Sequence, residues 1–210
     1  MVSTLIPGYP GVSILSDELV WDGRFPLQRV RFTNTRFDGA VSGVRTWELW
    51  RRGQAAAVLP YDPVRDLVVV IEQFRFPALA AGLNPVLVEL CAGLADGNEA
   101  PEVVAVREAQ EEMGLQVEQL ERIGNFLLTP GGSDENLTLF AGRVRVGEIG
   151  AGGLLGYGGL ASENEDIKVL ALPADEVIAN AIAGKYPNSV ATIGLLWLAA
   201  RRNWLREQWA

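Results

Sequence analysis

Three carboxylates fall on one side of a single predicted helix in this 210-residue chain. Glu108, Glu111 and Glu112 follow the spacing i, i+3, i+4, which places them in a narrow wedge of helix surface. Like charges at i, i+4 destabilise an isolated helix by roughly 0.2–0.5 kcal/mol, so helix stability does not explain them. Carboxylate oxygens are ligands for hard cations such as Mg²⁺, which retains coordination positions for water and substrate phosphates. The alternative is a solvated acidic helix face.

The residues around these acids predict a strand, a loop and a helix. The apolar run over residues 85–91 is typical of a buried strand, and Gly93 permits a sharp turn after it. Pro101 suits the first turn of a helix, where its missing N–H costs nothing. Gly114 suits the C-terminal cap. We therefore expect a helix over residues 101–113 with acids at the end that faces the loop.

The segment from Gly93 to Leu115 resembles the Nudix box, in which a glycine, five residues, a glutamate and seven residues precede REUxEExGU, with U aliphatic. Here Gly93 and Glu99 stand at the first two positions, and residues 107–115 read REAQEEMGL. Every fixed position is filled. The resemblance implies a Nudix fold of the α/β (α+β) class, in which a mixed β-sheet is sandwiched between helices.

The resemblance also implies roles for the box residues. Glu108 and Glu112 occupy the positions that bind the cation in the family, and the carbonyl of Ala92 is a further ligand in related enzymes. Arg107 and Glu111 stand at i, i+4 and could pair, which would remove Glu111 from the metal ligands. This arginine–glutamate pair plays a structural role in the family, and we include it in the candidate catalytic set. The implied cofactor is Mg²⁺, with Mn²⁺ or another divalent ion as the alternative.

A second group of residues resembles the ADP-ribose pyrophosphatase branch of the family. Pro130 follows Gly114 at a distance similar to the one that marks this branch, and residues 159–167 look like its acidic catalytic loop. By that resemblance Glu163 is the candidate general base and Glu165 an additional metal ligand. Residues two apart in an extended segment face the same way, so both acids could reach one site. The alternative is a solvated acidic loop.

Substrate contacts are predicted from less specific residues. Arg75 follows a predicted strand and could clamp a phosphate or ribose, or could be a surface charge. In the family the base stacks on the partner's N-terminal sheet, for which Trp47 and Phe25 are candidates by position; either ring could instead pack within that sheet. Gly131 and Gly132 could let the backbone approach the ligand or form a simple turn. Glu135 is a candidate ligand for a sugar hydroxyl.

The N-terminal part of the chain differs in pattern from the rest. Short alternating segments predict strands over residues 12–21, 27–34 and 44–50, separated by Asp-Gly turns. Three strands without a helix are marginally stable alone and need a partner surface. With the resemblance, this predicts a small antiparallel sheet in residues 1–53 that contributes to a homodimer, followed by a hydrolase domain in residues 54–210.

Strands and helices mix in the predicted hydrolase domain. Besides the box helix, we expect helices over residues 174–183 and 189–206, the second with an apolar stripe typical of a core helix. The glycine-rich segment 147–159 is expected to be a mobile loop leading to Glu163. The expected strands cover residues 55–59, 67–72, 86–91, 123–128, 137–146 and 168–172.

Composition excludes several other functions. The net charge of −8, without a basic stripe, argues against non-specific nucleic-acid binding. The chain has no histidine, which excludes Ser-His-Asp and Cys-His mechanisms and leaves general-base work to carboxylates. The only cysteine, Cys91, is expected to be a small core residue. The longest apolar run, residues 190–200, is about half the length of a membrane span, and no signal-peptide pattern is visible, so we expect a cytoplasmic enzyme without a membrane partner.

The resemblance implies Mg²⁺-dependent hydrolysis of the diphosphate bond of ADP-ribose, giving AMP and ribose 5-phosphate. The box reads only the diphosphate, so hydrolysis of another nucleoside diphosphate sugar, such as GDP-mannose, is an alternative. A Nudix-like ligand sensor that binds without cleaving is a more remote one. Such sensors usually lose box acids or carry a DNA-binding segment, and this sequence shows neither.

Overall fold

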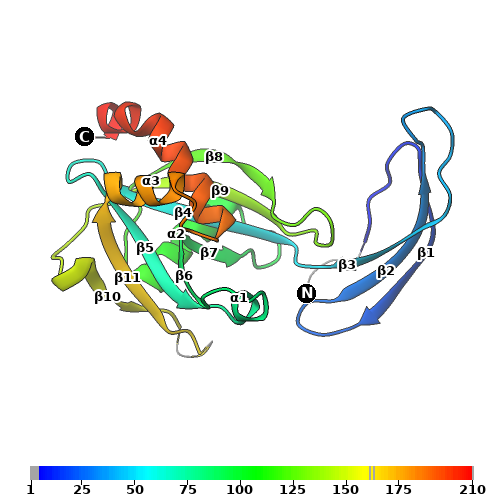
Figure 1. Ribbon diagram of the computed structural model, residues 1–210, viewed down its shortest axis with the longest axis horizontal. Helices are drawn as coiled ribbons and strands as arrows, with labels where there is room; N and C mark the ends of the chain where they lie inside the picture. The colour runs from blue at the N-terminus through cyan, green and yellow to red at the C-terminus, as the bar shows by residue number, and fades with distance from the viewer. Residues whose placement is uncertain (1–4, 161, 163, 210) are drawn as a thin grey trace. The chain divides into compact units, whose positions relative to one another are not determined.

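The computed structural model describes residues 5–160, 162 and 164–209 (Figure 1). Its contacts divide the chain into two compact units. The first comprises residues 1–54 together with 127–137, and the second comprises residues 55–126 and 138–210. The boundary between an N-terminal extension and a hydrolase domain at residue 53 stays a prediction.

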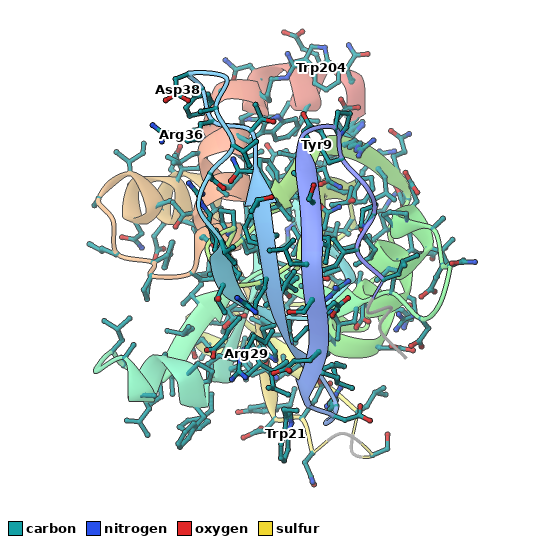
Figure 2. The ribbon with its side chains drawn as sticks, turned by 90° about the vertical axis from the view of Figure 1, so that its right-hand side faces the viewer. Tyr9, Trp21, Arg29, Arg36, Asp38 and Trp204 are labelled. Carbon is teal, nitrogen blue, oxygen red and sulfur yellow. The ribbon has the colours of Figure 1, made fainter. Side chains whose placement is uncertain are left out.

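The first unit contains a three-stranded antiparallel sheet in the order β1-β2-β3, as the alternating pattern predicts. Its strands are β1 (Val12–Trp21), β2 (Leu27–Asn34) and β3 (Arg45–Trp50). In Figure 2, β1 runs beside β2 from the Tyr9 end to Trp21, and β2 carries Arg29. Every residue of β1 is exposed. The sheet therefore leaves this strand without cover in the isolated chain.

The second unit is built on a mixed eight-stranded sheet with the order β10-β11-β5-β4-β9-β8; β6 pairs with β5, and β7 pairs with β4. The strands are β4 (Gln54–Asp62), β5 (Leu67–Phe74), β6 (Val86–Glu89), β7 (Cys91–Leu94), β8 (Gln119–Leu127), β9 (Asn136–Arg143), β10 (Leu154–Gly158) and β11 (Ile167–Pro173). The helices are α1 (Phe76–Ala80), α2 (Pro101–Met113), α3 (Ala174–Ile182) and α4 (Ser189–Trp209), with a 3-10 turn at Ala151–Gly153. Among the described residues, each helix is too short or too polar to span a membrane.

Two helices cover opposite faces of this sheet. On one face, α2 packs its buried residues against Val58 and Phe140 in the main core cluster. On the other face, α4 comes so close that a Cβ at Gly194 would lie 2.8–3.8 Å from Leu90, Leu59 and Leu139. Successive strand residues point to opposite faces, so Leu59 and Val58 face different helices. This confirms the predicted sandwich of a sheet between helices.

Three elements differ from the sequence-based expectation. The strand expected over residues 86–91 is two strands, because the chain changes partner from β5 to β4 around Leu90. The short helix α1 was not predicted. The loop expected over residues 147–159 is wrong in part, because it contains β10, which pairs with β11. Glycine in β10 serves close packing: a Cβ at Gly158 would lie 1.7 Å from the backbone oxygen of Glu112 on α2.

Candidate active site

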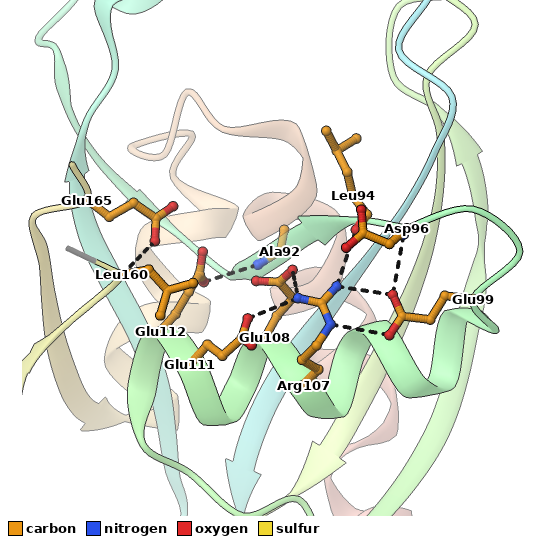
Figure 3. A network of polar contacts seen from close by, with 10 residues as sticks. All are labelled: Ala92, Leu94, Asp96, Glu99, Arg107, Glu108, Glu111, Glu112, Leu160 and Glu165. Atoms are coloured by element: carbon orange, nitrogen blue, oxygen red, sulfur yellow. Dashed lines mark hydrogen bonds and ion pairs between the residues drawn. The ribbon is translucent and has the colours of Figure 1, made fainter. Parts of the chain in front are cut away.

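Arg107 on α2 is the centre of a network of charged hydrogen bonds (Figure 3). Its Nε and Nη2 donate to Glu99 Oε1 and Oε2, each at 3.2 Å. Its Nη1 donates to Glu108 at 2.8 Å and to Glu111 at 2.9 Å. The i, i+4 spacing predicted the contact with Glu111, and the structure adds the other two. Because hydrogen bonds between charged groups are among the stronger ones in proteins, Arg107 holds these acids in fixed positions.

Gly93 makes room for Glu108. A Cβ at Gly93 would lie 1.7 Å from Glu108 Oε1, so any larger residue would displace the carboxylate. The Glu108 side chain is 13% exposed. Burial raises its pKa above the usual value, although the charge and hydrogen bond of Arg107 act in the opposite direction. The box glycine thus has a packing reason that spacing alone does not reveal.

Glu112 is the most buried acid of α2, with 3% of the residue exposed. Its Oε2 accepts a hydrogen bond from the backbone N–H of Ala92 at 3.3 Å. Burial raises the pKa of Glu112 to about 7; the Cys91 thiol lowers it in part, and the charges of Glu108 and Glu165 raise it further. A carboxylate in this setting gains most from a cation that would neutralise its charge.

Glu165 approaches the box from the segment between β10 and β11. Its Oε2 accepts a hydrogen bond from the Leu160 N–H at 3.1 Å, and its charge contributes to the raised pKa of Glu112. Gly159 permits this approach: it has φ +94°, and a Cβ there would lie 2.6 Å from Glu165 Cβ. The predicted general base, Glu163, lies outside the described residues.

Arg75 lies between β5 and α1 and is bound by an acid that the sequence analysis did not single out. Its Nε donates to Glu89 Oε1 at 3.0 Å and its Nη2 to Oε2 at 3.1 Å. Glu89 is only 7% exposed. Burial alone lowers the pKa of Arg75, but Glu89 raises it, and so do the charges of Glu112 and Glu165. Arg75 is therefore within electrostatic range of Glu112 and Glu165.

A signal for Glu89 was present in the sequence. It is a lone charge in the apolar run 85–91, and a charge inside a buried strand requires a partner. The sequence does not identify Arg75 as that partner, because β6 and β5 lie side by side only in the folded sheet.

The acids fit a hard divalent cation by their chemistry. The charges of Glu108 and Glu165 both act on Glu112, and the backbone N–H of Ala92 donates to the Glu112 carboxylate. Among the described residues, no group of three or more acid, histidine or cysteine side chains is arranged to hold a metal ion. Proteins commonly hold Mg²⁺ through one or two carboxylates plus substrate phosphates, so a partial ligand set suits this ion. The assignment of these four ligands stays a prediction.

Cys91 fulfils its expected role as a core residue. The thiol is free and fully buried, and burial, followed by the charge of Glu112, raises its pKa well above the usual value. It therefore stays protonated, which argues against a nucleophilic role.

The first unit contains the predicted contacts for the base. Trp47 is 39% exposed, and its Nε1 donates to the Gly131 carbonyl at 2.8 Å. These two residues line an open groove of about 490 Å³ together with Thr46 and Glu48. The Gly132 carbonyl accepts a hydrogen bond from the Trp50 N–H at 2.8 Å, which ties this loop to β3.

Phe25 and Glu135 contact one arginine that the sequence analysis missed. The guanidinium of Arg52 lies 4.0 Å from the centre of the Phe25 ring, and Trp50 meets the same ring edge-on at 6.0 Å. Arg52 also pairs with Glu135 at 3.3 Å. In this structure Phe25 and Glu135 therefore have partners within the unit, and their substrate contacts stay predictions.

The fold and the acid cluster together define the class of protein. The NUDIX domain family matches residues 51–185, which is more than half of the chain, and the chain belongs to this family. It is a Nudix hydrolase.

Similar proteins narrow the class further. The chain is 39% identical to an ADP-ribose pyrophosphatase of Haemophilus influenzae over 201 residues, covering 94% of this chain and 90% of that protein. It is 32% identical to a GDP-mannose pyrophosphatase of Salmonella arizonae over 188 residues, covering 89% and 94%. A crystal structure of an ADP compounds hydrolase has the same fold, with a TM-score of 0.66, 18% identity and coverage of 97% and 99%.

Proposed function

We propose that this protein hydrolyses the diphosphate bond of ADP-ribose, producing AMP and ribose 5-phosphate, with Mg²⁺ as its cofactor. The observation that carries the proposal is the buried carboxylate of Glu112, which is 3% exposed and bonded to the Ala92 N–H, with Glu108 one helical turn away and the charge of Arg75 acting on it. A diphosphate needs cationic partners, and Mg²⁺ together with an arginine provides them. The similarity to an ADP-ribose pyrophosphatase over 94% of the chain supports ADP-ribose as the substrate.

The residues of this chain divide the work of the reaction. Glu108, Glu112, Glu165 and the Ala92 carbonyl would hold Mg²⁺, which when bound neutralises phosphate charge and activates water. Arg107 fixes Glu108 and Glu111 through its hydrogen bonds at 2.8 and 2.9 Å. Two further residues, Arg75 and Glu163, would contact the reacting groups directly.

Arg75 binds a phosphate oxygen, and Glu163 accepts the proton of the attacking water. The water oxygen bonds to one phosphorus while the bond from that phosphorus to the bridging oxygen breaks. The bridging oxygen leaves on the other phosphate, so the two products each carry one phosphate. Carboxylates can fill the base role in this way without any histidine.

We also propose that the protein acts as a cytoplasmic homodimer that pairs through the first unit. Exposed apolar residues on a strand that lacks cover support this, and β1 carries several: Val12, Ile14, Leu15, Leu19, Val20 and Trp21. The only cysteine is free and buried, which suits a reducing compartment. The net charge of −8 supports a function without nucleic acid.

Hydrolysis of GDP-mannose is the second candidate, and the 32% identity to a GDP-mannose pyrophosphatase favours it over other sugars. A panel of ADP-ribose, GDP-mannose, ADP-glucose, NADH and diadenosine polyphosphates, each with Mg²⁺, separates the candidates. We expect kcat/KM for ADP-ribose to exceed that for each other substrate by roughly tenfold or more, a difference of ~1.4 kcal/mol in transition-state binding. Equal rates across the panel would remove the ADP-ribose assignment. Chelation of the cation should abolish turnover, and added Mg²⁺ should restore it.

A further inference from the structure

Glu89 is a buried acid that the reaction described above does not use. It ends β6 and is 7% exposed, and it pairs in register with Ile71 of β5. Directly paired residues of an antiparallel sheet share a face, and Ile71 belongs to the core cluster that includes α2. Glu89 therefore points to the side of the sheet that carries the acids of α2. Burying a carboxylate there is costly unless it is paired well.

The partner, Arg75, is held by both oxygens of Glu89. The two hydrogen bonds, from Nε at 3.0 Å and from Nη2 at 3.1 Å, give the bidentate arrangement that suits a guanidinium. The backbone N–H of Arg75 also donates to the Pro85 carbonyl at 2.7 Å. Both ends of this residue are thus anchored.

The pairing leaves one edge of the guanidinium available. Among the described residues, Nη1 of Arg75 makes no hydrogen bond. The Arg75 side chain is 41% exposed, whereas that of Glu89 is 9% exposed. An arginine held on one side by a buried acid and open on the other is preorganised to bind a planar or tetrahedral oxyanion.

The surroundings of Arg75 make its orientation important. Glu112 and Glu165 act on it electrostatically, and both are candidate metal ligands. A free arginine side chain would turn toward these acids and compete with the cation for them. The pairing with Glu89 keeps the Arg75 guanidinium from binding the candidate metal ligands and keeps it in one orientation.

We propose that Glu89 is a positioning residue, whose carboxylate holds the Arg75 guanidinium so that Nη1 meets a phosphate oxygen of the diphosphate substrate. This inference rests on the proposed function for the identity of the substrate, but the contact itself requires only a diphosphate.

The test measures binding of imidodiphosphate, a diphosphate that resists hydrolysis, by calorimetry in the presence of Mg²⁺. Four variants are compared with the wild type: Glu89→Gln, Glu89→Asp, Arg75→Ala and the double variant Glu89→Gln/Arg75→Ala. Glu72→Gln is the matched control, because Glu72 is an acid of β5 that forms an ion pair with Lys168 at 2.8 Å, and it is not part of the acid cluster.

Glu89→Gln should weaken binding by roughly 10- to 100-fold, the equivalent of the ~1.5–3 kcal/mol contributed by a hydrogen bond to a charged group. Glu89→Asp should recover part of the loss. Arg75→Ala should match Glu89→Gln, and the double variant should lose no more than about twofold beyond Arg75→Ala, because Glu89 acts only through Arg75. Glu72→Gln should bind as the wild type does. In turnover assays, Glu89→Gln should raise KM and change kcat by less than about threefold.

Binding by Glu89→Gln within about threefold of the wild type, or additive losses in the double variant, would overturn the proposal. If Glu89→Gln does not fold, binding of imidodiphosphate by Arg75→Lys tests the proposal instead. This substitution keeps the charge but loses the two-pronged pairing, so binding within about threefold of the wild type would again overturn the proposal. If the cycle behaves as expected while the substrate panel gives no hydrolysis of ADP-ribose, the positioning role stands and the proposed substrate is wrong.

Discussion

Glu108 and Glu112 of α2 are largely shielded from solvent, where a carboxylate charge is costly. Burial is the largest cause of the raised pKa of both residues. Arg107 offsets part of this cost at Glu108, while the hydrogen bonds to Glu112 within the described part of the chain come from Ala92 and Cys91, which are both uncharged. The hydrogen bonds of Glu112 therefore bring no positive charge of their own, and a bound divalent cation would supply it.

The first prediction concerns the stability of the metal-free protein. The pKa of Glu112 is raised from 4.5 to about 7, so the folded state binds this proton more tightly than the unfolded state does. The resulting stabilisation is fully present below pH 4.5 and is lost as pH rises through about 7. With a chelator present, the free energy of unfolding should fall by an amount on the order of 3 kcal/mol across this window. Urea unfolding at a series of pH values measures it, and Glu112→Gln should flatten the dependence.

The second prediction concerns the general base. Glu163→Gln should lower kcat by roughly 10²- to 10⁴-fold, since general-base catalysis contributes that much. KM and the Mg²⁺ dependence should change little, because this residue is assigned proton transfer and not metal binding. Ser162→Ala, at the preceding position, is the control and should keep its activity. A loss below about tenfold for Glu163→Gln would exclude it as the base.

The residues of the box could be predicted from their types and spacing, because the pattern itself specifies them. Spacing gave the contact of Arg107 with Glu111, which the structure has at 2.9 Å. The contacts of Glu89 and Arg52 were not predicted, because each depends on strands that only the folded sheet brings together. The environment of Glu112 was also outside the reach of the sequence, since burial is a property of the packed core.

At the scale of elements, α2 is fixed against β10 by an unusually close backbone contact. A Cβ at Gly158 would lie 1.7 Å from the backbone oxygen of Glu112, so this glycine lets β10 approach the end of α2 that carries the acids. The neighbouring Gly156 has no atom within 4 Å of its ideal Cβ. The two glycines of one strand thus differ in what a side chain would meet.

The third prediction follows from this difference. Gly158→Ala should destabilise the protein by about 1–3 kcal/mol, as overpacking does, and should weaken Mg²⁺ binding because Glu112 is displaced. Gly156→Ala should have little effect on either quantity. Thermal unfolding and calorimetric titration with Mg²⁺ measure both. Equal effects of the two substitutions would show that the contact does not position α2.

Element prediction succeeded where the sequence pattern was regular and local. The bounds of β1, β2 and α2 agree with the predicted ranges, because alternation and helix-capping residues mark them. β10 was missed because its glycines suggested a loop, although one of them, Gly158, serves packing against α2. The strand over residues 86–91 was not divided in two, because its apolar run does not show that the chain changes partner.

At the scale of the whole molecule, the sheet order could not be read from the sequence. β4 lies between β5 and β9 in the path, and residues 127–137 group with the N-terminal unit rather than with their neighbours in the chain. Such long-range pairings depend on the packed core and not on local propensity. The division into an extension and a hydrolase domain at residue 53 stays a prediction, and no local pattern indicated that residues 127–137 group with residues 1–54.

The fourth prediction concerns assembly. Sedimentation equilibrium should give twice the mass of the 22.8 kDa chain, because the exposed apolar residues of β1 would be covered in a dimer. Leu19→Asp on β1 should shift the equilibrium toward the monomer. Val64→Asp, at an exposed apolar residue of the second unit, is the control and should leave the mass unchanged. A wild-type protein that sediments as a monomer would contradict the proposed homodimer.

The central claim is that Glu112 and its neighbours hold the cation with which ADP-ribose is cleaved. Its most direct test is product analysis after incubation of ADP-ribose with Mg²⁺ and either the wild type or Glu112→Gln. We predict AMP and ribose 5-phosphate from the wild type, none after chelation, and a rate for Glu112→Gln lower by roughly 10²-fold or more, the loss typical of a removed charge-stabilising group. Turnover of Glu112→Gln within a few-fold of the wild type, or no cleavage of ADP-ribose by the wild type, would contradict it.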